Sequence, residues 1–174
     1  AIGKRTDIWV TGLLRQKYAK FFPKAFKLFN RNRIYIDKEL PKKIADLIAA
    51  EKVIGWFQGR MEFGPRALGN RSILGDPHSA AMQRTLNLKI KYRESFRPFA
   101  PAVLAESAEQ YFDLPQVDRH LPARFMLLVV PVLEDKQGVI PAVNHLGTAR
   151  IQTVYPDANP LYHRIIQGFG EATG

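Results

Sequence analysis

The stretch from Gly59 to Pro101 is dense in arginine, lysine and glycine, and its cations outnumber its carboxylates by eight to three. Glycine, proline and aromatic residues interrupt the cations, so the stretch differs from the Lys/Glu face of a solvated helix. Arginine presents a planar fork of donors that fits phosphate or carboxylate oxygens two at a time, and glycine lets a backbone approach a ligand closely. The cations are Arg60, Arg66, Arg71, Arg84, Lys89, Lys91, Arg93 and Arg97. The pattern predicts a site for an anionic small molecule or for a nucleic-acid backbone.

Three segments of the sequence resemble one enzyme family in order and in separation. They are GRMEFGPRALGNRSIL at 59–74, KIKYRESFRPFAP at 89–101 and GTARIQTV at 147–154. Together they resemble the C-terminal part of the ATP-dependent O-carbamoyltransferases that decorate nodulation factors and antibiotics, over Val53 to Gly174. A run as long as the first segment is far more specific than a lone glycine motif.

The resemblance implies an α/β fold with a twisted mixed sheet flanked by helices, similar to the YrdC-like domain of threonylcarbamoyl-adenylate synthases. It also implies that the domain binds carbamoyl phosphate and ATP and forms carbamoyl-adenylate and pyrophosphate. A separate N-terminal metal-containing domain, outside this chain, then transfers the carbamoyl group to a hydroxyl. Mg²⁺ is expected to come with ATP. No His/Asp/Glu spacing in the sequence supports a metal bound by the protein itself.

Lys91 and Arg97 are the first candidates for ligands of carbamoyl phosphate. The YrdC-like proteins have a Lys-x-Arg motif and then a basic residue before proline, and Lys91-Tyr92-Arg93 with Arg97-Pro98 resembles that pattern. If residues 89–97 are extended, Lys91, Arg93 and Arg97 share one face. The alternative is a solvated basic edge strand that deters aggregation.

Arg66, which follows Gly64-Pro65, completes the expected catalytic set of Lys91, Arg97 and Arg66. Its alternative role is a structural ion pair with Glu62. Arg60, like Arg71, could contact the substrate or could pair with a nearby carboxylate.

The GTAR segment supplies the remaining candidates. By resemblance Arg150 lies near the phosphate, and Gln152 is expected on the same strand face. The expected substrate-binding residues are Arg60, Arg93, Arg150 and Gln152. The family usually has His-Val-Asp-Gly before this segment, whereas this chain has Leu146 in the place of the aspartate.

The formal charge of +10 is concentrated near the N-terminus. Residues 1–43 contain twelve Lys and Arg against three Asp and Glu, and the remaining 131 residues contain fourteen against thirteen. A protein that binds a long phosphate backbone usually spreads its basic face over the folded domain. The distribution therefore favours a compact anionic ligand over nucleic acid, although a module that binds double-stranded RNA or another polyanion remains the alternative function.

Composition excludes several other classes. There is no cysteine, hence no disulfide framework and no thiolate nucleophile or metal ligand. No apolar run approaches the roughly 20 residues of a membrane span, and the N-terminus lacks the apolar segment of a signal peptide. We therefore expect a cytoplasmic protein without a membrane partner.

Local signals predict the elements around the candidate site. Residues 1–41 are expected to be a basic adaptor or linker, and 42–174 the YrdC-like domain. Predicted helices cover 42–51, 77–88 and 106–112, with a last one from Asn159-Pro160. Predicted strands cover 53–58, 99–104, 125–133, 139–143 and 149–154, and 115–124 is predicted to be an exposed loop.

By resemblance, an Asn-Thr-Ser-Phe-Asn motif is expected just beyond Gly174. The sequence is therefore expected to be truncated at its C-terminus and to form little carbamoyl-adenylate alone. A further possibility is a domain that folds but is catalytically silent without its partner domain.

Overall fold

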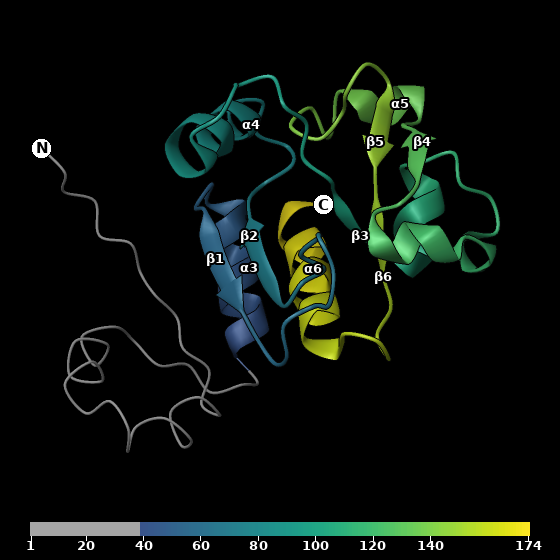
Figure 1. Cartoon of the computed structure of the whole chain (residues 1–174), viewed down its shortest axis with the longest axis horizontal. Coiled ribbons are helices and arrows are strands. Elements are labelled where there is room, and N and C mark those ends of the chain that lie inside the picture. The colour runs from purple at the N-terminus through teal and green to yellow at the C-terminus, as the bar shows by residue number, and fades with distance from the viewer. Residues whose placement is uncertain (1–38) are drawn as a thin grey trace, which may run out of the picture.

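The computed structural model describes residues 39–174, so the predicted adaptor over 1–41 lies almost entirely outside the described residues. The described part is a mixed α/β structure (Figure 1). In chain order its elements are helix α3 (Leu40–Ala49), strands β1 (Ile54–Phe57) and β2 (Arg71–Leu74), helix α4 (Met82–Thr85), a π-helix (Leu86–Lys91), strand β3 (Ala102–Leu104), three 3₁₀-helices (Ala105–Gln110, Val117–Arg119 and Leu121–Phe125), strand β4 (Val129–Pro131), helix α5 (Glu134–Gln137), strands β5 (Thr148–Arg150) and β6 (Gln152–Val154), and helix α6 (Pro160–Thr173).

The strands form three two-stranded sheets instead of the single twisted sheet that the sequence predicted. β1 and β2 are antiparallel, with Ile54 opposite Leu74. β4 and β5 are also antiparallel, whereas β3 and β6 are parallel, with Ala102 opposite Gln152. The α/β class is thus confirmed, but strands of three or four residues do not join into one sheet.

Helices α3 and α6 pack together beside β1 and β2, and they bury one hydrophobic core (Figure 1). The predicted helical stripe is confirmed, since Ile44 and Ile48 of α3 are buried. The start of α6 is also confirmed, because the Asn159 side chain accepts a hydrogen bond from the Tyr162 amide and Pro160 is the first helical residue.

A second core lies around β4 and β5 and includes Phe112, Val130 and Ile151. The parallel pair β3–β6 connects the two cores, because Val103 belongs to the second core and Val154 to the first. This pair therefore holds the β1–β2 half of the domain against the β4–β5 half (Figure 1).

Four predicted elements differ from the structure. The helix after Asp76-Pro77 begins only at Met82, because the Asp76 carboxylate accepts a hydrogen bond from the His78 amide at 2.8 Å and forms a local turn. Of 125–133, only Val129–Pro131 is a strand. Residues 139–143 form turns, and the predicted loop 115–124 contains short 3₁₀-helices.

Candidate anion-binding site

The loop between β1 and β2 is organised by one carboxylate. Oε1 of Glu62 accepts hydrogen bonds of 2.7 Å from the backbone amides of both Leu68 and Asn70. Partial burial opposes the charged form of Glu62, but these amide bonds outweigh it and lower the pKa of the carboxyl group. Glu62 thus stabilises the turn that carries Arg66.

Arg71 has a structural role at the base of the same loop. Its Nη1 donates to the carbonyls of Gln58 (2.6 Å) and Asn70 (2.7 Å), and its Nη2 donates to the carbonyl of Gly59 (3.1 Å). Its guanidinium also lies 3.3 Å from the centre of the Phe57 ring. Arg71 therefore has few donors left for a ligand.

Two buried glutamines attach this loop to the rest of the domain. Nε2 of Gln58 donates to the Gly69 carbonyl and to Oδ1 of Asn159, both at 2.8 Å. Nε2 of Gln152 donates to the Leu68 carbonyl at 2.9 Å, while its Oε1 is buried without a partner. The expected ligand Gln152 therefore supports the loop from β6.

The basic run is not an extended strand, so the expected shared face of Lys91, Arg93 and Arg97 does not form. Leu86–Lys91 is a π-helix, and Tyr92 follows it with φ = 49° in the left-handed region. Lys91 lies exposed at the end of this helix. The helical turn separates it from the two arginines that follow.

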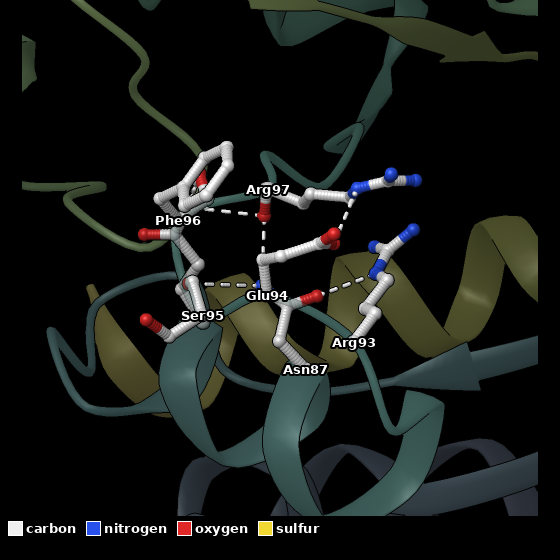
Figure 2. A network of polar contacts seen from close by, with 7 residues as sticks. Asn87, Arg93, Glu94, Ser95, Phe96 and Arg97 are labelled. Carbon is white, nitrogen blue, oxygen red and sulfur yellow. Dashed lines mark hydrogen bonds and ion pairs between the residues drawn. The ribbon is translucent and has the colours of Figure 1, made fainter.

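The loop 93–97 is held by Asn87 of the π-helix (Figure 2). Nε of Arg93 donates to Oδ1 of Asn87 at 2.7 Å, and Nδ2 of Asn87 donates to the carbonyls of Ser95 (3.0 Å) and Arg97 (2.8 Å). Nε of Arg97 forms an ion pair of 2.9 Å with Glu94. Asn87 was not among the residues expected at the site.

Arg93 and Arg97 line a cavity of about 360 Å³ together with Arg150 and His145. Phe99, Val129 and Val143 provide apolar walls, and no carboxylate is among the described residues that line it. Burial and the nearby Arg66 guanidinium lower the pKa of Arg150. A cavity that gathers cations without a lining carboxylate is suited to an anion.

Arg66 extends this cluster of cations. Its Nε is buried without a hydrogen-bond partner, and its charge acts on Arg150. Among the described residues no ion pair joins Arg66 to Glu62, whose recorded hydrogen-bond partners are backbone amides. The ion pair with Glu62 that was the alternative role of Arg66 is therefore not formed within residues 39–174.

The structure thus brings together four of the seven expected residues: Arg66, Arg93, Arg97 and Arg150. Arg60 is exposed, and its carbonyl accepts a bond from Asn70. His145 also lines the cavity, although it was not among the expected site residues. The neighbouring Leu146 is exposed. The departure from the family pattern at residues 144–146, just before GTAR, is a signal that could have led to His145.

Nowhere from residue 39 onward do three or more histidine, aspartate or glutamate side chains gather as metal ligands. Within the same residues, no helix has the length and apolar character needed to cross a bilayer.

Known proteins are similar to this chain over most of its length. A family model described as "Carbamoyltransferase C-terminus" matches residues 45–174. Nodulation protein NolO of Bradyrhizobium diazoefficiens is 50% identical over 136 residues, which are 78% of this chain and 24% of the relative. Nodulation protein NolNO of Sinorhizobium fredii is 49% identical over 137 residues, 78% of this chain and 20% of the relative.

A protein named as an O-carbamoyltransferase is also similar. The 3'-hydroxymethylcephem-O-carbamoyltransferase of Streptomyces clavuligerus is 39% identical over 132 residues, which are 75% of this chain and 24% of that enzyme. The chain therefore spans about a quarter or less of the length of these relatives.

Proposed function

Because the chain belongs to the carbamoyltransferase C-terminal family, we propose that it is the domain of an O-carbamoyltransferase that binds carbamoyl phosphate and ATP and forms carbamoyl-adenylate. Another part of the full-length protein then transfers the carbamoyl group to an acceptor hydroxyl. The proposal includes a YrdC-like fold for residues 42–174, with which the mixed α/β architecture is compatible.

The observation that carries the proposal is the convergence of Arg93, Arg97 and Arg150 on one cavity, with Arg66 beside Arg150. Two like charges 4 Å apart repel by roughly 4 kcal/mol at an effective dielectric constant of 20. The cations that line this cavity therefore repel one another, with Glu94 offsetting part of the charge of Arg97, and a bound anion relieves the remaining repulsion. A phosphate or a carboxylate accepts paired donors from each guanidinium.

The reaction suits a site made of cations. Carbamoyl-adenylate contains one phosphate, which comes from ATP when pyrophosphate leaves. Atom balance then requires carbamoyl phosphate to lose its own phosphate, with one water consumed, so that a carbamate oxygen attacks the α-phosphorus. Charge accumulates on phosphoryl oxygens during the attack, and positioned cations stabilise it without covalent catalysis. Mg²⁺ comes with ATP as part of the substrate.

The relatives support the transferase part of this proposal. One of them is named for the carbamoylation of a hydroxymethyl group, and it shares 39% of its matched residues with this chain.

The test is a calorimetric titration of the chain with carbamoyl phosphate and with a non-hydrolysable ATP analogue. We expect binding of both, and we expect Arg150→Met to weaken it about tenfold, the loss of one charged hydrogen-bond partner. Arg84→Met is the matched control, since Arg84 is exposed on α4 and does not line the cavity. Equal affinities for the two variants would contradict the proposed site.

The same titration can be extended to the polyanion alternative. Several phosphate contacts with RNA give a steep loss of affinity with salt. If double-stranded RNA binds with such a slope, while carbamoyl phosphate and the ATP analogue do not bind, the proposed function is wrong.

A further inference from the structure

We infer that Asn87 is a positioning residue of the anion site and that it acts through Arg93, whose guanidinium it orients. The inference rests on the proposed function for the identity of the anion. Its own basis is the set of hydrogen bonds by which one side-chain amide holds both ends of the loop 93–97 (Figure 2).

The three partners of Asn87 use both hydrogens of its amide and one of the two acceptor positions of its oxygen. Nδ2 has two hydrogens, and it donates to two backbone carbonyls, those of Ser95 and Arg97. Oδ1 accepts from Nε of Arg93. A flipped amide would point its hydrogens at the guanidinium donor and its oxygen at the two carbonyls, so the partners define the orientation of the group.

Burial of the Asn87 amide costs free energy unless the amide forms hydrogen bonds, so a role in packing alone does not explain it. The side chain is fully buried, at 0% exposure, whereas asparagine is seldom buried without a polar task. It also lies in a helix, where asparagine is a weak former. The Asn87 carbonyl accepts a further bond of 3.1 Å from the Arg93 amide, so Arg93 is attached through backbone and side chain alike.

These contacts orient Arg93 without using the atoms that a ligand needs. The bond to Asn87 occupies Nε and leaves Nη1 and Nη2, while the guanidinium lies 4.9 Å from the centre of the Phe99 ring. Figure 2 shows the guanidinium groups of Arg93 and Arg97 extending to the same side, away from Asn87. Arginine that is already oriented loses less side-chain freedom when an anion binds.

Gln83 provides a matched comparison on the preceding helical turn. Its Nε2 donates to the carbonyls of Phe96 and Arg97, both at 3.1 Å, but within residues 39–174 its side chain bonds no guanidinium. A residue that only anchors the loop should behave like Gln83, whereas a residue that orients Arg93 should not.

The experiment measures the affinity of the chain for inorganic pyrophosphate in a double-mutant cycle of Asn87→Leu and Arg93→Ala. We expect Asn87→Leu to raise Kd about tenfold in the parent and less than about threefold when Arg93 is already alanine. In NMR spectra, exchange of the Arg93 Nε–H with solvent should become faster in Asn87→Leu. Gln83→Leu should change neither quantity by more than about twofold. Should Asn87→Leu not fold, as judged by thermal unfolding, Asn87→Ser replaces it in the same cycle.

Several results would overturn the inference. These are an unchanged Kd for Asn87→Leu, a tenfold loss that persists in Arg93→Ala, an equal loss for Gln83→Leu, and a parent that does not bind pyrophosphate. A parent that binds pyrophosphate but neither carbamoyl phosphate nor the ATP analogue overturns the proposed function instead, and the cycle then still decides the role of Asn87.

Discussion

The side-chain amide of Gln152 donates a hydrogen bond of 2.9 Å to the carbonyl of Leu68, 84 positions earlier in the chain. This bond fastens the loop that carries Arg66 to the strand β6, which follows Arg150 and Ile151. Two of the three segments that resembled the carbamoyltransferases, 59–74 and 147–154, are therefore in direct contact.

We expect Gln152→Leu to weaken carbamoyl phosphate binding more than it weakens the fold. The Leu68 carbonyl loses its donor, but the substitution also removes Oε1, which is buried without a partner, so the free energy of unfolding should change by no more than about 1 kcal/mol. The Kd should rise about threefold to tenfold because Arg66 is less well held. Calorimetry and urea unfolding measure the two effects.

Gln167→Leu is the control for this prediction, since the Gln167 side chain is exposed and bonds Glu171 on its own helix. An unchanged Kd for Gln152→Leu would contradict the link.

Glu62 should make the fold sensitive to acid. Its pKa in the folded protein is below the ordinary value of 4.5, so its contribution is fully present above that value and is lost as the pH falls through the folded pKa. We expect Glu62→Gln to lower the free energy of unfolding at pH 7 by about 1 kcal/mol, a value discounted for solvent exposure, and to have a smaller effect at pH 3. Urea unfolding at both pH values tests this, with the exposed Glu51→Gln as control. A loss that is equal at pH 7 and pH 3 would show that the charge of Glu62 is unimportant.

Lys91 and Arg97 should now differ as ligands of carbamoyl phosphate. From the sequence, both were first candidates for ligands of carbamoyl phosphate. In the structure Arg97 lines the cavity, whereas Lys91 lies exposed at the end of the π-helix. We expect Arg97→Ala to raise Kd by tenfold or more and Lys91→Ala by about twofold at most. Titration of both variants with carbamoyl phosphate measures this difference. The reverse order would mean that the loop rearranges when the ligand binds.

Gly69→Ala should disrupt the fold at the contact between the β1–β2 loop and α6. Gly69 has φ = 103°, and a Cβ atom there would lie 2.4 Å from Cδ1 of the buried Tyr162 ring. We expect a loss of at least about 2 kcal/mol in the free energy of unfolding. Gly170→Ala on α6 is the control, because open space surrounds it and alanine should stabilise the helix by about 0.5–1 kcal/mol. A neutral Gly69→Ala would show that the loop does not pack closely on Tyr162.

The elements that the sequence predicted well depend on local signals. Pro41 lies in the first turn of α3, and Asn159 caps α6 through the amide of Tyr162, three residues later. The strand at 125–133 was predicted too long because its apolar residues belong partly to a 3₁₀-helix and partly to strand β4. Phe125 ends a 3₁₀-helix, and only Val129–Pro131 pairs with β5.

The candidate site was predictable in composition but not in geometry. Arg93, Arg97 and Arg150 were expected together, and they do line one cavity. The alternation of cations along 89–97 suggested a strand, yet such alternation is equally possible in a helix followed by a turn. The turn after the helix is held by hydrogen bonds from the Asn87 side chain to carbonyls eight and ten residues later. No local sequence pattern predicts these bonds.

Arg71 has a consequence for the evolution and the engineering of this domain. Its guanidinium reaches three carbonyls from two segments and also covers the Phe57 ring. A lysine at this position would keep the charge, but its single ammonium group could not span the same acceptors or stack on the ring. Exchange of arginine for lysine is often treated as neutral when homologous sequences are compared or libraries are designed. At position 71 it should instead be selected against, for reasons of shape and not of charge.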